Sequence, residues 1–252
     1  MVSAEYQGQG GYGRLITHAL SHPLPRRFTM GFPSDVERRS ARRHGSPGEL
    51  GRMAQWVRWL RPVGGSRLRW TGEATLAYFG RAIAVAAGRP RRPVVPLNVL
   101  GPEVDELAAE SRLWWPCGLI RDSAYLRWRW QEQPERGWHF RAVRDDGGRL
   151  RGLAVIGRYK GTGWIADLLA PDAPTIRALL LDAAAELRRA RCALVTCWYN
   201  DPRPWTARAF HAAGFFARGT GPWVLHIPGT RTPEVSGRLD AWYLTAGDTD
   251  LV

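Results

Sequence analysis

Hydrophobic and polar residues follow their most regular pattern in the second part of the chain, from residue 94 onward. Residues 175–191 carry apolar side chains three and four positions apart, which predicts a helix with one buried face. Asp145-Asp-Gly-Gly148 is typical of a hairpin turn between two strands. The elements predicted from residue 94 are strand 94–100, helices 102–112 and 122–130, strands 140–144, 150–159 and 164–169, helix 175–191, strand 193–199, helix 206–213, and strands 223–227 and 241–245.

The first 60 residues are less regular. A glycine cluster at residues 7–13 precedes a short amphipathic run, and residues 28–32 are predicted as a strand. Residues 35–44 are predicted as a basic helix. Residues 49–60 are predicted as a further helix, because four apolar residues fall on one helical face: Met53, Trp56, Val57 and Leu60.

Two stretches rich in turn residues, 62–69 and 89–93, mark a linker. We therefore expect three parts: residues 1–62, a linker with one helix over residues 63–93, and residues 94–252. In the last part, three consecutive antiparallel strands precede a helical crossover. This order predicts an α/β (α+β) protein with a mixed, mostly antiparallel sheet flanked by helices.

Five short segments carry a resemblance: Tyr6-Gln-Gly-Gln-Gly10, Gly31-Phe-Pro33, Arg121-Asp-Ser-Ala-Tyr-Leu-Arg-Trp-Arg129, Ala212-Ala-Gly-Phe215 and Trp242-Tyr-Leu-Thr-Ala-Gly-Asp248. With the order of the elements, they resemble the GNAT family, the GCN5-related N-acetyltransferases. The resemblance implies that residues 1–62 are the C-terminal half of a first GNAT copy and that residues 94–252 are a complete second copy. Such a half copy leaves an open strand edge. We therefore expect the strand at 28–32 to be covered by upstream sequence or by the second copy.

The glycine cluster is the candidate cofactor site. GNAT proteins bind the pyrophosphate of acyl-CoA on backbone N–H groups between the fourth strand and the next helix, where the pattern is Gln/Arg-x-x-Gly-x-Gly/Ala. The start of a helix favours an anion, and glycines let the backbone approach it. The alternative is an N-terminal turn without a ligand. The resemblance implies that acetyl-CoA binds to Gln7, Gly8, Gln9, Gly10, Gly11, Tyr12 and Gly13, with Tyr12 standing where a small residue is usual.

The corresponding loop of the second copy, residues 170–175, contains no glycine and two prolines, which lack N–H donors. Asp172 in this loop would repel a phosphate. Asp172 or Thr175 is better interpreted as a helix N-cap. We therefore expect the second copy to be structural or to shape the acceptor site rather than to bind CoA.

The resemblance also indicates where catalysis could occur. GNAT enzymes use a base on or near the fourth strand, which points to Asp167, flanked by apolar residues that could raise its pKa. The alternative is a charge on the polar face of a half-exposed strand. The tyrosine that often protonates the leaving thiolate is replaced by Ala41 in the first copy and by Phe210 in the second. Either catalysis is lost or water supplies that proton.

Aromatic residues suggest an acceptor site. The chain has 13 tryptophans, and some lie near the place where GNAT proteins bind the acceptor. Their rings could stack on a sugar or another planar group, although burial in the core is the alternative for each of them. The candidates for substrate binding are Trp128, Trp130, Trp198 and Tyr199.

The composition mainly argues against certain partners, a metal site and membrane insertion. The formal net charge is +13, but Lys160 is the only lysine, so the charge reflects an arginine-rich composition and no nucleic-acid partner is expected. Histidines and cysteines show no metal-ligand spacing, so no metal is expected. The start is polar and the most apolar stretch, residues 74–87, is too short to span a bilayer. We therefore expect a cytoplasmic protein without membrane insertion.

The function that the resemblance implies is transfer of an acyl group, such as acetyl, from acyl-CoA to a small amine, for example an amino sugar or an amino acid derivative. Two alternatives remain open. One is a peptidyl transferase that uses aminoacyl-tRNA, which the basic charge would suit. The other is a catalytically inert binding or scaffold protein, which the missing tyrosine and the altered second loop favour.

Overall fold

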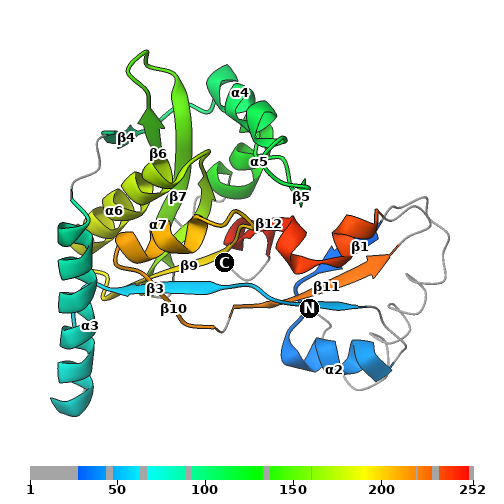
Figure 1. Cartoon of the computed structure of the whole chain (residues 1–252), viewed down its shortest axis with the longest axis horizontal. Helices are drawn as coiled ribbons and strands as arrows, with labels where there is room; N and C mark the ends of the chain where they lie inside the picture. The colour runs from blue at the N-terminus through cyan, green and yellow to red at the C-terminus, as the bar shows by residue number, and fades with distance from the viewer. Residues whose placement is uncertain are drawn as a thin grey trace. The chain divides into compact units, whose positions relative to one another are not determined.

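The computed structural model describes residues 28–43, 48–62, 67–88, 92–132, 137–159, 161–219, 221–228 and 233–249 (Figure 1). The chain forms two compact units, each built from segments that are distant in sequence. Unit 1 consists of residues 1–52 and 222–239, and unit 2 of residues 53–221 and 240–252. The candidate loop Gln7–Gly13 lies outside the described residues.

Unit 2 contains a long mixed sheet. Every neighbouring pair in its main path is antiparallel except β8 and β9, which run parallel. The mostly antiparallel sheet expected from the sequence is therefore confirmed. The strands, in spatial order, are β10 (Phe216–Ala217), β3 (Gln55–Trp59), β9 (Leu194–Asn200), β8 (Thr162–Leu169), β7 (Leu150–Tyr159), β6 (His139–Arg144) and β4 (Val94–Pro96).

Helices flank this sheet. The central one, α6, contacts β6, β7 and β8 with the apolar face that the sequence predicts, and Leu180 on that face is fully buried. Asp172 caps α6 by accepting a hydrogen bond of 2.8 Å from the backbone N–H of Thr175, as expected. The helices of unit 2 are α3 (Arg67–Ala86), α4 (Pro102–Ser111), α5 (Ser123–Leu126) with the π-helical turn η2 (Arg127–Gln131), α6 (Ala173–Arg189) and α7 (Thr206–Ala212).

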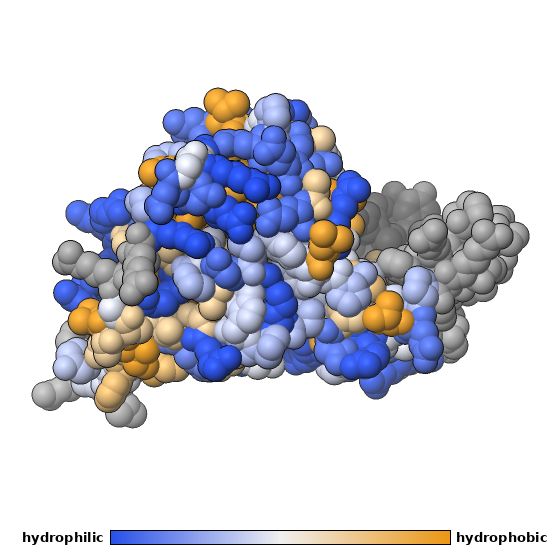
Figure 2. Space-filling model, turned by 45° about the horizontal axis from the view of Figure 1, so that its top comes forward, coloured by the Kyte–Doolittle hydropathy of each residue, from blue (hydrophilic) through white to orange (hydrophobic). Residues whose placement is uncertain are grey.

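The helix α3 corresponds to the linker region. Apolar side chains remain exposed on its surface, and apolar residues gather at the lower left of the space-filling view, on the side where α3 lies in Figure 1 (Figure 2). None of the described helices is long and apolar enough to cross a membrane. The exposed apolar residues of α3 are Leu76, Tyr78, Phe79 and Val85.

Unit 1 contains a three-stranded antiparallel sheet in the order β1, β11, β2. The strand β1 (Phe28–Gly31) is followed by the helix α2 (Asp35–Arg43) and by β2 (Glu49–Arg52). The central strand β11 (Trp223–Pro228) comes from the far end of the chain. The edge of β1 is therefore covered by a strand of the second copy, which confirms one of the two expected arrangements.

Residues 49–60 do not form the predicted helix. They form β2 and β3, which are separated by Met53 and Ala54. Gly51, within β2, has a φ of 136°, which is unfavourable for residues with a side chain. β3 pairs with β9 along one edge and with β10 along the other. The helical spacing of the apolar residues was misleading because a strand buried within a sheet also carries consecutive apolar residues.

The order strand, helix, strand, strand occurs twice along the chain, as β1, α2, β2, β3 and as β9, α7, β10, β11. In each run the last strand belongs to a different sheet from the other two strands. The repeated order of strand, helix, strand, strand agrees with two related copies, while the domain boundaries at residues 62 and 94 remain predictions.

Candidate functional site

The candidate site of unit 2 lies where the paired strands β8 and β9 diverge. These strands pair only over Gly163–Ile165 and Val195–Cys197, although β8 continues to Leu169 and β9 to Asn200. The strand β12 (Trp242–Thr245) pairs with the end of β9, and the 3₁₀ turn η6 (Ala246–Asp248) contacts both β8 and β9. The C-terminal segment thus lies between the separating ends of the two strands.

A buried ion-pair cluster holds this segment. Arg121 Nε donates to Asp167 Oδ1 at 2.6 Å, and Arg121 Nη2 donates to Asp248 Oδ2 at 2.5 Å. Thr245 Oγ1 donates to Asp167 Oδ1 at 3.1 Å, and Trp130 Nε1 donates to Asp167 Oδ2 at 3.4 Å. The side chains of Arg121 and Asp167 are 0% exposed and that of Asp248 is 2% exposed. The cluster therefore links the helix after residue 121, strand β8 and the C-terminal turn.

The charged groups of this cluster are stabilised by one another, because they are buried and in direct contact. Burial alone would lower the pKa of Arg121, but the charges of Asp167 and Asp248 raise it well above its usual value, so the guanidinium stays charged. Burial raises the pKa of Asp248, and the charge of Arg121 opposes that rise only in part. Burial also raises the pKa of Tyr125, which lies beside the cluster.

The space around the cluster is filled. A Cβ atom placed on Gly247 would lie 2.6 Å from Asp167 Oδ2 and 2.9 Å from Tyr125 Oη. The sequence contains a signal for this turn, since Thr245-Ala-Gly-Asp248 forms a capping box in which the backbone N–H of Thr245 donates to Asp248 Oδ2 at 2.7 Å. Only a glycine fits at this position, and no room is left beside Asp167 for a substrate.

This geometry argues against Asp167 as the general base. A base must reach the proton that it removes, directly or through one water molecule. Both oxygens of Asp167 instead accept hydrogen bonds from buried groups. The alternative interpretation, a charge on a half-exposed strand, is also wrong because the side chain is completely buried. Arg121 was not identified from the sequence as the ion-pair partner of Asp167. Arg121 begins one of the five segments that carry the resemblance, but no role was assigned to it there.

The predicted acceptor-binding residues do not gather on one open face. Trp130 and Tyr199 are each 1% exposed, so burial in the core describes them better than binding of the acceptor. Trp198 is half-buried and packs edge-to-face on Trp164 at 5.0 Å. Trp128 alone among the four has a largely free ring, at 61% exposure. Of the predicted set, only Trp128 presents an aromatic face to solvent.

The loop before α6 is occupied by protein groups. The side chain of Asp172 caps the helix and forms an ion pair of 3.1 Å with Arg92. The carbonyls of Ala170 and Pro171 accept hydrogen bonds from Arg203, at 2.8 Å and 3.1 Å. Burial alone would raise the pKa of Asp172, but hydrogen bonds from Thr175 and Arg92 lower it, so the loop carries a fixed negative charge. At this position, the carboxylate of Asp172 is available to repel a phosphate, and two backbone carbonyls are already bonded to Arg203.

Phe210, which the resemblance places where GNAT enzymes often have a tyrosine, lies on α7. Its ring is fully buried and stacks on Trp56 with ring centroids 4.6 Å apart. Ala41, its counterpart in the first copy, lies on α2. Within the described ranges, no group of three or more histidine, cysteine or carboxylate side chains could hold a metal ion.

Comparison with known proteins identifies the fold. No family model and no curated protein matches the sequence. A GCN5-related N-acetyltransferase from Anabaena variabilis has a TM-score of 0.58 and 16% identity, with 89% of this chain and 52% of that chain covered. A conserved protein from Enterococcus faecalis, described as a "Probable N-Acyltransferase", has a TM-score of 0.54 and 10% identity, with 88% and 51% covered. The chain therefore has the GNAT fold and spans about half the length of these two structures.

Proposed function

We propose that the protein is an acyl-CoA-dependent N-acyltransferase in which the first copy binds the cofactor and the second copy supports it. The observation that carries this proposal is the GNAT fold over 89% of the chain. The strand β1 and the helix α2, which follow the glycine cluster along the chain, have the order that the resemblance implies after a phosphate-binding loop. The two structures compared above are described as acyltransferases, which favours this chemistry over unrelated uses of the fold.

The occupied loop of unit 2 supports the assignment of the cofactor to the other copy. Asp172 and the carbonyls that face Arg203 provide no anion cradle there. The backbone N–H groups of Gln7–Gly13 would hold the pyrophosphate in the first copy. The bound acyl-CoA would supply the activated acyl group, and a small amine would accept it.

Several residues of this chain limit how the reaction proceeds. Phe210 cannot donate a proton, and neither can Ala41, so the thiolate would take its proton from water. Asp167 is held by Arg121 and is not available as a base. The amine would then react best above its own pKa, because no buried carboxylate is placed to deprotonate it. Trp128 remains as a candidate to contact the acceptor.

A second candidate function is a binding or scaffold protein on the same fold. The observation that favours it is the filled space between β8 and β9, where the Arg121–Asp167–Asp248 cluster replaces an open site. This alternative requires no turnover, but it permits binding of acyl-CoA or of a partner.

Calorimetric titration of acetyl-CoA into the full chain tests the proposal, with release of free CoA thiol measured in the presence of amino sugars and amino acid amides. We expect saturable binding and thiol release that depends on the amine and rises with pH. S-Acetylpantetheine, which lacks the nucleotide and the pyrophosphate of acetyl-CoA, serves as the control and should bind much more weakly. Binding without thiol release for every amine would support the scaffold function, and no binding of acetyl-CoA would overturn the proposed one.

A further inference from the structure

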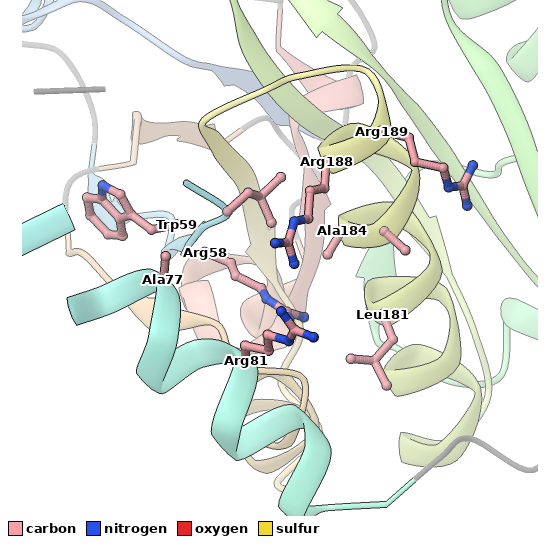
Figure 3. Close-up of a pocket in the computed structure, with 10 residues that line it drawn as sticks. Arg58, Trp59, Ala77, Arg81, Leu181, Ala184, Arg188 and Arg189 are labelled. Atoms are coloured by element: carbon pink, nitrogen blue, oxygen red, sulfur yellow. The ribbon is translucent and has the colours of Figure 1, made fainter. Parts of the chain in front are cut away.

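Unit 2 contains a second polar feature, on the side of α6 away from its capped end. A pocket of about 480 Å³ lies between β3, α3 and the C-terminal half of α6 (Figure 3). Its apolar lining includes Leu60, Ala77 and Leu181. Pockets of about 300–1,000 Å³ are the usual size for small-molecule sites. The pocket is therefore large enough for a compact ligand.

Three arginines from three different elements point into this pocket. Arg58 comes from β3, Arg81 from α3 and Arg188 from α6. Their guanidinium groups lie close together in the close-up view, whereas the side chain of Arg189 points away from them (Figure 3). Residues that converge from separate elements are held by the fold rather than by their neighbours in sequence.

Within the part of the chain that the structure describes, no carboxylate neutralises these arginines. No described carboxylate forms an ion pair with Arg58, Arg81 or Arg188. The two carboxylates in the second half of α6, Asp182 and Glu186, are paired with Arg141 instead. The negative end of the α6 dipole favours a cation at Arg188, but it explains neither Arg58 nor Arg81.

Arg58 has two unfavourable interactions in this arrangement. Its Nη1 is fixed by a hydrogen bond of 2.7 Å to the carbonyl of Ala213, while its Nε is buried and has no hydrogen-bond partner among the described residues. Burial, followed by the charge of Arg188, lowers the pKa of Arg58 to about 10. A buried donor without a partner and repulsion between like charges are both relieved when an anion binds.

We infer that this arginine pocket binds a phosphate group of a small phosphorylated molecule. Guanidinium groups match the oxygens of phosphate in charge and in geometry, and a group with two or more negative charges is needed to balance three cations. The apolar lining can contact the carbon skeleton of the ligand. The pocket shares no residue with the loop before α6 or with the proposed CoA loop, so it adds a second ligand to the proposed function.

Inorganic pyrophosphate is the probe, titrated calorimetrically into the full chain at constant ionic strength. We expect binding by the unmodified protein and at least about tenfold weaker binding by Arg81→Gln and by Arg188→Gln, since each loses a charge-assisted contact. Arg189→Gln removes the same charge from the same helical turn, but the Arg189 side chain points away from the three converging guanidinium groups, so this variant should bind almost normally. Because the proposed CoA loop would also bind pyrophosphate, each titration is repeated in the Gly10→Asp background, where the same dependence on Arg81 and Arg188 should remain. This separates the site from the CoA loop and from the proposed function.

Thermal melting without ligand distinguishes lost binding from lost folding. Arg81→Gln should melt at the same temperature as the unmodified protein or higher, because repulsion is relieved. An eight-nucleotide single-stranded RNA tests the source of the phosphate: binding with the same arginine dependence would indicate a nucleic-acid backbone instead of a small molecule. The inference is overturned if pyrophosphate does not bind, or if Arg189→Gln weakens binding as much as Arg188→Gln does.

Discussion

Replacing Leu180 by aspartate is expected to prevent stable folding of unit 2. Leu180 lies in the middle of α6, is 0% exposed and belongs to the main apolar core. An aspartate there would place a charge without a partner in the core, at a cost of about 4 kcal/mol or more. Whole proteins are stable by only about 5–15 kcal/mol, so this single change would remove much of the stability.

Solubility and thermal melting followed by circular dichroism measure this effect. Ala185→Asp adds the same charge at an exposed position of the same helix, beside the arginine pocket, and should fold with an unchanged or higher midpoint. Leu180→Asn has a side chain of nearly the same shape as aspartate but without the charge. It should therefore be destabilised less than Leu180→Asp, and the difference measures the effect of the charge. A soluble Leu180→Asp variant with an unchanged midpoint would show that a different face of α6 is buried.

Replacing Arg121 by methionine is expected to destabilise the protein by about 3–5 kcal/mol, because Asp167 and Asp248 would remain buried without their cation. Burial already raises the pKa of Asp248 with Arg121 present. In the variant, the folded-state pKa of Asp248 should lie even further above its unfolded value, because the opposing charge of Arg121 is gone. Protonation then favours the folded state, so the loss of stability should shrink as the pH falls from about 8 to about 5 and grow as it rises again.

Urea unfolding at several pH values measures this prediction. Arg208→Met on α7 is the matched control, since Arg208 is exposed and has no ion-pair partner in the described part of the chain, and its stability should change by less than about 0.5 kcal/mol. Adding Asp167→Asn to Arg121→Met should restore part of the lost stability. Equal stability of Arg121→Met and the unmodified protein at all pH values would mean that the cluster does not hold the C-terminal segment.

Local signals in the sequence were sufficient for much of the fold. The hairpin of β6 and β7, the helix α6 and the cap at Asp172 depend on residues within a few positions of one another. Short-range periodicity and turn chemistry determine such elements, and all three agree with the prediction.

The sequence predictions failed where contacts between residues far apart in sequence determine the structure. Residues 49–60 have helical spacing, but β3 is a strand because β9, about 140 residues later, pairs with it along its whole length. Asp167 was identified as important, yet its role depends on Arg121 and Asp248, which lie 46 and 81 positions away along the chain. The arginine pocket likewise joins β3, α3 and α6, and no short motif marks it.

The assignment of the cofactor to the first copy is tested most directly by comparing acetyl-CoA binding in two loop variants. Gly10→Asp places a side chain and a negative charge against the pyrophosphate and should weaken binding by at least about tenfold, the loss expected for one charge-assisted hydrogen bond. Asp172→Ala changes the occupied loop of unit 2 and should leave the affinity nearly unchanged, with a loss of about 1 kcal/mol of stability from the missing helix cap. Binding kept by Gly10→Asp and lost by Asp172→Ala would contradict the account and move the cofactor into unit 2.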